Sequence, residues 1–268
     1  MSRAILLQHV EYASAGRLVP LLRDFGIPTE VRKLYKGDEV PSDLDQMRLL
    51  IVLGGPMGIA DIGSEKYPFL AKELELLKRL VACDRTTLGI GLGAQLLAHA
   101  AGAKVYPCVK PGATPADAAT PTPELGWAPV NFPFPGGTEP VVMGLVDGAP
   151  MFHWHFDTFD LPKLPPPANA PPPPAPPPPT GNSLLSSTRT CRNQAFRFRN
   201  RLFGFQYHFE MTQEGIEQLV TAERETCLKV LGEGAPDRIR AETAKNFGRY
   251  SRLGDRLIRN FVQFLKVS

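Results

Sequence analysis

The stretch from Thr86 to Gly102, TTLGIGLGAQLLAHAAG, constrains the fold more than any other part of the chain. Its apolar start, Thr87–Ile90, predicts a buried parallel strand, because strands covered on both faces read as near-continuous apolar runs. Glycines follow at positions 91 and 93, and apolar residues at helical spacing then run to Gly102, a typical helix end. Strand, glycine turn and helix predict a nucleophile elbow, whose central residue stands above the sheet at a helix N-terminus. That residue is Gly91, which has no side chain.

The segments before the elbow alternate between strand-like and helix-like patterns. Such alternation predicts an α/β fold with a mostly parallel sheet and helices on both faces. Ligands of such sheets bind at the carboxyl ends of the strands, where the Gly54-Gly55 turn and the elbow both lie. We predict strands near Arg3–Val10, Glu30–Tyr35 and Leu49–Leu53, and helices near Gly16–Phe25 and Tyr67–Ala82.

The rest of the chain is predicted to complete one domain spanning residues 1–268. Two Pro/Ala-rich stretches, 110–123 and 162–180, predict loop insertions, the second an extended polyproline segment that cannot join a sheet or helix. A hairpin is predicted from Gln194–Phe198 and Leu202–Tyr207. The remainder, 213–268, predicts a helical extension that breaks at 232–236 and ends with a last helix near Asp255–Lys266.

The composition excludes several classes of protein. With 43% hydrophobic and 21% charged residues, the chain is globular in composition. A net charge of +3 is small for 268 residues and gives no reason to expect a nucleic-acid partner. Neither a signal peptide nor a membrane-spanning apolar run is evident, so we expect a cytoplasmic protein without a membrane partner. The four cysteines form no CxxC pair, and we expect no disulfide framework, no metal and no other cofactor.

His208 and Glu210 are the first candidates for chemistry. They lie two positions apart at the end of a predicted strand, so both side chains can point the same way. A carboxylate beside a histidine fixes its tautomer and stabilises the imidazolium, which suits a general base for a nucleophile. Taken alone, such a pair is more often a coincidental one on the protein surface, without a catalytic role.

Five motifs occur in an order that resembles class I glutamine amidotransferases, specifically stand-alone proteins similar to the glutaminase domain of GMP synthase. The resemblance implies a three-layer, flavodoxin-like α/β/α fold with a Cys-His-Glu triad. It implies hydrolysis of glutamine to glutamate and ammonia through a thioester, with a synthetase-type partner as the ammonia acceptor. The motifs are GGP at 54–56, GIGLGAQ at 89–95, ELGW at 124–127, HWHFDTFDLP at 153–162 and GFQYHFE at 204–210.

The resemblance also implies roles for individual residues. His208 and Glu210 match the histidine and glutamate of the triad. The backbone N–H groups of Gly55 and Leu92 match the oxyanion hole. The remaining matches are the substrate-binding positions Gln95, His155 and Asp157.

The chain departs from the family motif GxCxGxQ at its central position, where Gly91 stands in place of the cysteine. Loss of the nucleophile from a triad costs about a million-fold in turnover. Glycine at an elbow nevertheless avoids the backbone strain that a residue with a Cβ carries. We therefore expect an amidotransferase homologue of impaired or absent activity. No obvious substitute is found among the cysteines, Cys83, Cys108, Cys191 and Cys227.

Two further departures lie near the predicted site. Phe156 stands where the family often has the glycine of HGD, and Phe209 replaces the common proline of HPE. Both are candidates to reshape the pocket toward a larger or more apolar ligand, or are variation within the family.

Three alternatives remain open to the sequence. One is a glutamine-binding or partner-binding pseudoenzyme. The second is a hydrolase in which His208 and Glu210 activate a water molecule. The third is a metal hydrolase built on the HxHxD run of His153, His155 and Asp157, since alternate strand positions place both imidazoles on one face.

Overall fold

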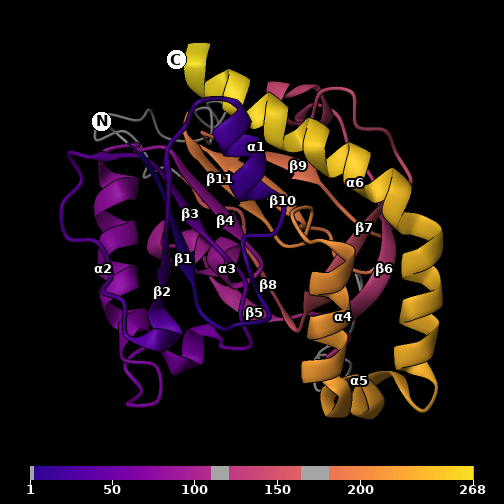
Figure 1. Cartoon of the computed structure of the whole chain (residues 1–268). Coiled ribbons are helices and arrows are strands. Elements are labelled where there is room, and N and C mark those ends of the chain that lie inside the picture. The colour runs from indigo at the N-terminus through magenta and orange to yellow at the C-terminus, as the bar shows by residue number, and fades with distance from the viewer. Residues whose placement is uncertain (1–2, 110–120, 164–180, 268) are drawn as a thin grey trace, which may run out of the picture.

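A computed structural model describes residues 3–109, 121–163 and 181–267, and its centre is one seven-stranded sheet (Figure 1). The two predicted insertions, 110–123 and 162–180, fall almost wholly outside these ranges. The strand order is β2-β1-β3-β4-β11-β10-β9. The strands are β1 (Arg3–Gln8), β2 (Thr29–Lys33), β3 (Met47–Val52), β4 (Thr87–Ile90), β9 (Asn182–Ser186), β10 (Ala195–Phe198) and β11 (Leu202–Phe205).

The first five strands of this order run parallel, and β10 and β9 are added antiparallel. In chain order the parallel part reads 2-1-3-4-5, which is the flavodoxin-like order. The predicted mostly parallel α/β fold is confirmed, as is the hairpin, in which β10 pairs with β11.

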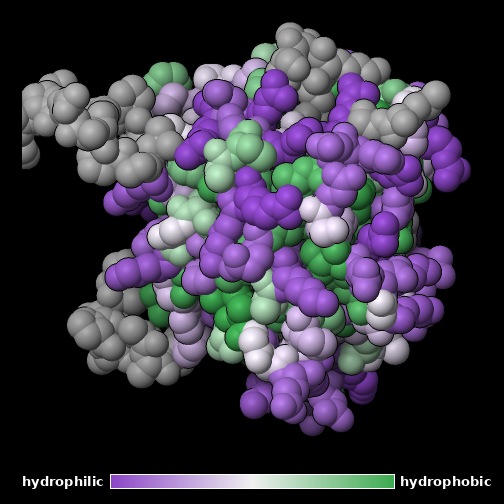
Figure 2. All heavy atoms as spheres, turned by 90° about the vertical axis from the view of Figure 1, so that its left-hand side faces the viewer, coloured by the Kyte–Doolittle hydropathy of each residue, from purple (hydrophilic) through white to green (hydrophobic). Residues whose placement is uncertain are grey.

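Helices cover both faces of the sheet because its strands are apolar on both sides. In β1, Ala4 and Leu6 pack into one core and Ile5 and Leu7 into the other. The first core includes side chains of α1 (Leu18–Asp24) and α6 (Ala235–Val267), and the second includes those of α2 (Phe69–Ala82) and α3 (Leu92–Ala100). Figure 2 shows the side on which α2 lies, where hydrophilic side chains cover much of the surface. Helix α2 thus buries an apolar stripe and exposes a charged one.

Two small antiparallel pairs stand beside the main sheet. They are β5 (Val105–Pro107) with β8 (Asp157–Phe159), and β6 (Glu124–Val130) with β7 (Ala149–His155). The register of the second pair sets Glu124 opposite His155. The remaining elements are helices α4 (Gln213–Ala222) and α5 (Arg224–Leu231) and the short 3-10 helices η1 (Leu34–Lys36), η2 (Ile59–Asp61), η4 (Gly136–Thr138) and η5 (Pro140–Val142).

The end of the chain differs from the prediction. A single 33-residue helix, α6, starts at Ala235, and the break before it covers only Gly232 to Gly234. Pro236 does not delay the helix, because in the first turn its missing N–H is not needed. The glycine at 254, which weakens the helical pattern, is required by packing: a Cβ there would lie 2.2 Å from the carbonyl oxygen of Phe209. No helix in the described part of the chain is long and apolar enough to cross a membrane.

Candidate active site

The elbow forms where the sequence predicts it. Strand β4 ends at Ile90, α3 begins at Leu92, and Gly91 between them adopts φ +57° and ψ −118°. This left-handed φ favours glycine. The Gly91 N–H donates to the carbonyl oxygen of Phe205, 2.8 Å away, which ties the turn to β11. A Cβ added to Gly91 would lie 3.5 Å from both Cε1 and Nε2 of His208. A side chain at the elbow would therefore meet that imidazole in ordinary van der Waals contact.

His208 and Glu210 follow β11 and are both buried. Nδ1 of His208 lies 2.7 Å from Oε1 of Glu210, and Oε2 accepts the backbone N–H of Phe209 at 2.9 Å. Because an ionised carboxylate only accepts hydrogen bonds, Nδ1 carries the proton. In the neutral ring Nε2 is then the unprotonated nitrogen, and it faces Gly91.

Arg17 fixes the segment that carries this pair. Its backbone N–H donates to the carbonyl oxygen of Glu210 at 2.8 Å. Its guanidinium donates to the carbonyl oxygens of Phe209 and Met211, and also to Ser251 and Asp255 of α6. One side chain therefore joins α1, the segment after β11 and α6.

The Gly54-Gly55 turn forms the opposite wall. A Cβ on Gly54 would lie 2.9 Å from Cε1 of His208, so the close approach of the turn requires glycine. Nδ1 of His9 lies 3.2 Å from the Gly54 carbonyl oxygen, and Nε2 lies 2.9 Å from Oε2 of Glu73. Burial, the largest single cause, opposes a charge on His9, but the carboxylate of Glu73 together with the backbone carbonyls of Gly54 and Leu53 outweighs it and raises the pKa of His9. Sequence reasoning missed this buried pair, although His9 directly follows β1.

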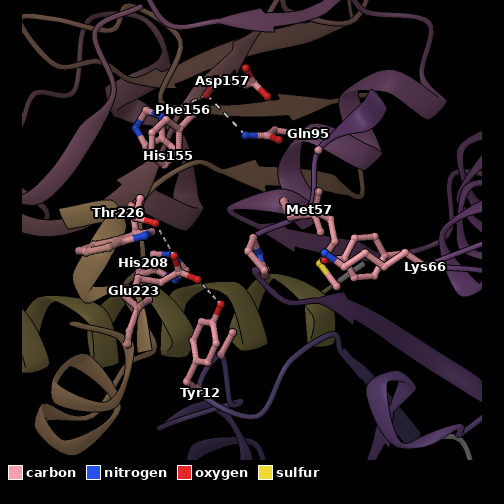
Figure 3. Close-up of a pocket in the computed structure, with 18 residues that line it drawn as sticks. Tyr12, Met57, Lys66, Gln95, His155, Phe156, Asp157, His208, Glu223 and Thr226 are labelled. Carbon is pink, nitrogen blue, oxygen red and sulfur yellow. Dashed lines mark hydrogen bonds between the residues drawn. The ribbon is translucent and has the colours of Figure 1, made fainter. Parts of the chain in front are cut away.

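A cavity of about 430 Å³ opens beside His208 (Figure 3). Leu92 is the first residue of α3, so its N–H has no acceptor within the helix. Gly91 and Glu210 are not among the residues that line the cavity. The predicted residues that line the cavity are Gly55, Leu92, Gln95, His155, Asp157 and His208.

The predicted substrate-binding residues meet at the backbone of Asp157. Its carbonyl oxygen lies 3.4 Å from Nε2 of Gln95 and 3.1 Å from Nδ1 of His155. Its carboxyl is half-buried at the cavity, and this burial raises its pKa against the opposing charge of His155. The side chains of Gln95 and His155 thus meet at the Asp157 backbone, and all three residues line the cavity.

Glu124 anchors this region from behind. Its Oε2 lies 3.0 Å from Nε2 of His155 and 3.4 Å from Nδ1 of His153. Although burial favours the neutral acid, the hydrogen bond from His155 and the close imidazole of His153 hold the pKa of Glu124 well below its usual range. Its oxygens also accept from the hydroxyls of Thr188 and Thr190 and the amide of Gln194.

The arrangement differs from the HxHxD metal alternative. Among the described residues, the group close enough to share a metal ion is Glu124 with His153 and His155. The carboxyl of Asp157 is not part of it, and Glu124 is already surrounded by hydrogen-bond donors. The cluster therefore fits an anchor for the end of β7 better than a metal centre of that kind.

The positions of the cysteines leave the elbow without a thiol. All four lie in the described ranges, and none lines the cavity. Cys83 is exposed beyond α2, Cys227 is buried on α5, and Cys191 is buried beside Cys108. Sγ of Cys108 lies 3.4 Å from Nδ1 of His155 but is buried, and its hydrogen bond with Cys191 together with burial raises its pKa. A buried neutral thiol of this kind is inert.

Only one of the two phenylalanine departures lies at the cavity. Phe156 is 40% exposed and lines it. Phe209 is fully buried, with its ring centroid 5.1 Å from that of Phe205, and it does not line the cavity, which favours variation within the family at this position.

Several cavity residues lie outside the motifs that the sequence analysis identifies. The hydroxyl of Tyr12 donates to Oε1 of Glu223 at 2.5 Å, and the hydroxyl of Thr226 donates to Oε2 at 2.9 Å. All three line the cavity. Tyr12 follows the end of β1, which is a weak hint, whereas Glu223 and Thr226 lie at the junction of α4 and α5, outside every motif.

Comparisons with known proteins agree with this architecture. The family model described as glutamine amidotransferase class-I matches residues 15–223. The glutamine amidotransferase-like protein YfeJ of Salmonella typhimurium is 26% identical over 220 residues, covering 81% of this chain and 80% of YfeJ. A glutamine amidotransferase from Thermotoga maritima has a TM-score of 0.76 and 25% identity, covering 100% of this chain and 99% of that one.

A more distant structure, described as a GMP synthase component from Thermoplasma acidophilum, shares the fold at a TM-score of 0.58 and 18% identity, covering 100% of this chain and 96% of that one. The family match extends over more than three quarters of the chain, from α1 to the end of α4. The chain therefore belongs to the class I glutamine amidotransferase family.

Proposed function

We propose that this chain binds glutamine, or a ligand with the same γ-glutamyl group, beside His208, and that it does not hydrolyse that ligand through a thioester. The observation that carries the proposal is the 3.5 Å between the Cβ position of Gly91 and the imidazole of His208. The centre of the elbow faces the imidazole of His208, a potential general base, but Gly91 has no side chain that could act as a nucleophile.

The surrounding groups match what a thiol at position 91 would need. Nε2 of His208 would take the thiol proton, while Glu210 holds the imidazole in the required tautomer and stabilises its charged form. The N–H groups of Leu92 and Gly55 would stabilise the oxyanion. The carboxyl of Asp157 would bind the α-amino group of the substrate at the other end of the cavity.

Without the thiol, the same groups retain the capacity to bind. The expected loss of turnover is about a million-fold, or roughly 8 kcal/mol of barrier. The fold does not suffer, because glycine adopts the φ of the elbow without strain. A synthetase-type ammonia acceptor, which the family implies, would be needed only by a form with cysteine at position 91, because only that form would release ammonia.

The test compares the chain with its Gly91→Cys variant, measuring release of glutamate and ammonia from glutamine. We expect turnover in the variant only, and thermal stabilisation of the unaltered chain by glutamine. Gly91→Ala is the matched control, because it fills the Cβ position without supplying a thiol. Turnover by the unaltered chain that His208→Ala abolishes would overturn the proposal and favour the water-activating hydrolase.

A further inference from the structure

The cavity has a second polar end that the groups around Asp157 do not use. Figure 3 shows Gln95, His155 and Asp157 at one end, and Tyr12, Glu223 and Thr226 at the other, on the side where His208 lies. At about 430 Å³ the cavity falls in the range that holds drug-sized ligands, which are much larger than glutamine. A ligand that fills it therefore extends past His208 toward Glu223.

The carboxylate of Glu223 is held in a fixed orientation. Tyr12 donates to one oxygen and Thr226 to the other. Burial and the hydrogen bond to Glu223 raise the pKa of Tyr12, so its hydroxyl keeps the proton that it donates. Each carboxylate oxygen has a second lone pair, so both can accept a further donor from a ligand.

Glu223 lacks a cationic partner among the residues that the structure describes. Within the described ranges, no ion pair includes it, although the ion pairs found there engage several other carboxylates. Lys66, which lines the same cavity, instead places its ammonium 5.0 Å from the ring centroid of Tyr67. Tyr12, which donates to Glu223, lines the cavity together with Tyr67 and Trp154, and a cavity that holds aromatic rings and a carboxylate suits an ammonium group.

We propose that Tyr12 and Glu223 form a subsite for a positively charged amine, so that the preferred ligand is a γ-glutamyl amide whose amine portion ends in an ammonium. The inference rests on the proposed function, because the γ-glutamyl group is assigned to the end of the cavity at Asp157. The amine subsite lies on the side of the cavity where His208 lies, which is where the leaving group of the amide would sit. The general base returns its proton to that departing amine.

The same placement gives a balanced reaction once a thiol stands at position 91. The sulfur forms a bond to the γ-carbonyl carbon, and the carbon–nitrogen bond of the amide breaks. His208 gives the proton it took from the thiol to the amine nitrogen. Water then cleaves the thioester to glutamate and restores the thiol.

Calorimetric titration of the unaltered chain tests the subsite. The probes are glutamine, γ-glutamylputrescine, γ-glutamylbutylamine, which lacks the terminal charge, and γ-glutamyl-γ-aminobutyrate, which carries a terminal carboxylate. We expect γ-glutamylputrescine to bind at least about tenfold more tightly than γ-glutamylbutylamine, because a charge-assisted hydrogen bond is worth that much. Glu223→Gln is expected to remove this gap, whereas Glu225→Gln, an exposed neighbour on α5, keeps it.

Each other outcome overturns the inference in a distinguishable way. Equal binding of the two amides, or a gap that survives in Glu223→Gln, removes Glu223 from recognition. Tightest binding of the carboxylate probe assigns the subsite to Lys66 instead. In all these cases glutamine binding, or glutamine turnover by Gly91→Cys, leaves the proposed function standing. If no probe binds and Gly91→Cys hydrolyses none of them, both proposals fail.

Discussion

The Cβ position of Gly91 and the Nε2 atom of His208 are 3.5 Å apart, a contact that neither crowds the elbow nor leaves it open. A side chain there is therefore limited by backbone conformation and not by space. Gly91→Cys is therefore expected to gain turnover and lose stability, whereas Gly91→Ala is expected only to lose stability.

Gly91→Ala and Gly91→Cys should each lower the free energy of unfolding by about 1–3 kcal/mol. The reason is the φ of +57°, which strains a residue with a Cβ. Urea unfolding of the two variants beside the unaltered chain measures the cost. An alanine variant of equal or greater stability would show that the elbow does not hold glycine in a strained region.

In the Gly91→Cys background, His208→Ala and Glu210→Gln should each reduce glutamine turnover, by about 10²–10⁴-fold for the loss of a positioned base. Glu210→Gln acts by loosening the tautomer that the 2.7 Å contact fixes. Steady-state ammonia release measures both effects. His99→Ala, on α3 but outside the cavity, is the control and should leave turnover unchanged.

The buried His9–Glu73 pair predicts a dependence of stability on pH. The folded-state pKa of His9 is raised, so its contribution is fully present below about pH 6.5 and is lost as pH rises through the folded value. The advantage of the unaltered chain over Glu73→Gln should therefore shrink toward alkaline pH. Urea unfolding across that range is the measurement, and a constant or growing advantage contradicts the assignment.

Arg17→Ala should lower stability by about 2–3 kcal/mol, because its hydrogen bonds to Phe209, Met211 and Ser251 are lost together. Asp255→Asn removes only the ion pair and should cost less than about 1 kcal/mol, since the Asp255 side chain is 35% exposed. Chemical denaturation compares the two. Similar effects for both variants would place the stabilisation in the ion pair instead.

Two glycines of α6 should respond oppositely to alanine. A Cβ on Gly254 would overlap the carbonyl oxygen of Phe209 at 2.2 Å, so Gly254→Ala is destabilising despite its higher helix propensity. A Cβ on Gly248 would meet nothing nearer than 3.9 Å, and Gly248→Ala should stabilise by about 0.5–1 kcal/mol. Thermal unfolding of both variants provides the comparison.

The parts of the site that follow local rules could be predicted from the sequence. An apolar run followed by glycines predicts the elbow. The spacing of His208 and Glu210 at a strand end predicts that their side chains point the same way. The contacts of His9 with Glu73 and of Tyr12 with Glu223 join positions far apart in the chain, and no periodic pattern marks them. The same holds for Gly254. Glycine is required there only because α6 packs against the segment after β11, where a Cβ would overlap the chain.

The hydrogen bonds of Arg17 cannot all form at the same stage of synthesis. A ribosome releases β4, the elbow and β11 before α6, yet Arg17 completes its hydrogen bonds only when Ser251 and Asp255 arrive. The hydrogen bonds from Arg17 to the Phe209, Glu210 and Met211 carbonyls can form before α6 is made, whereas those to Ser251 and Asp255 can form only afterwards. A nascent chain can therefore hold the sheet and the residues that line the cavity before α6 is tied to them, because the last of these lining residues is Thr226.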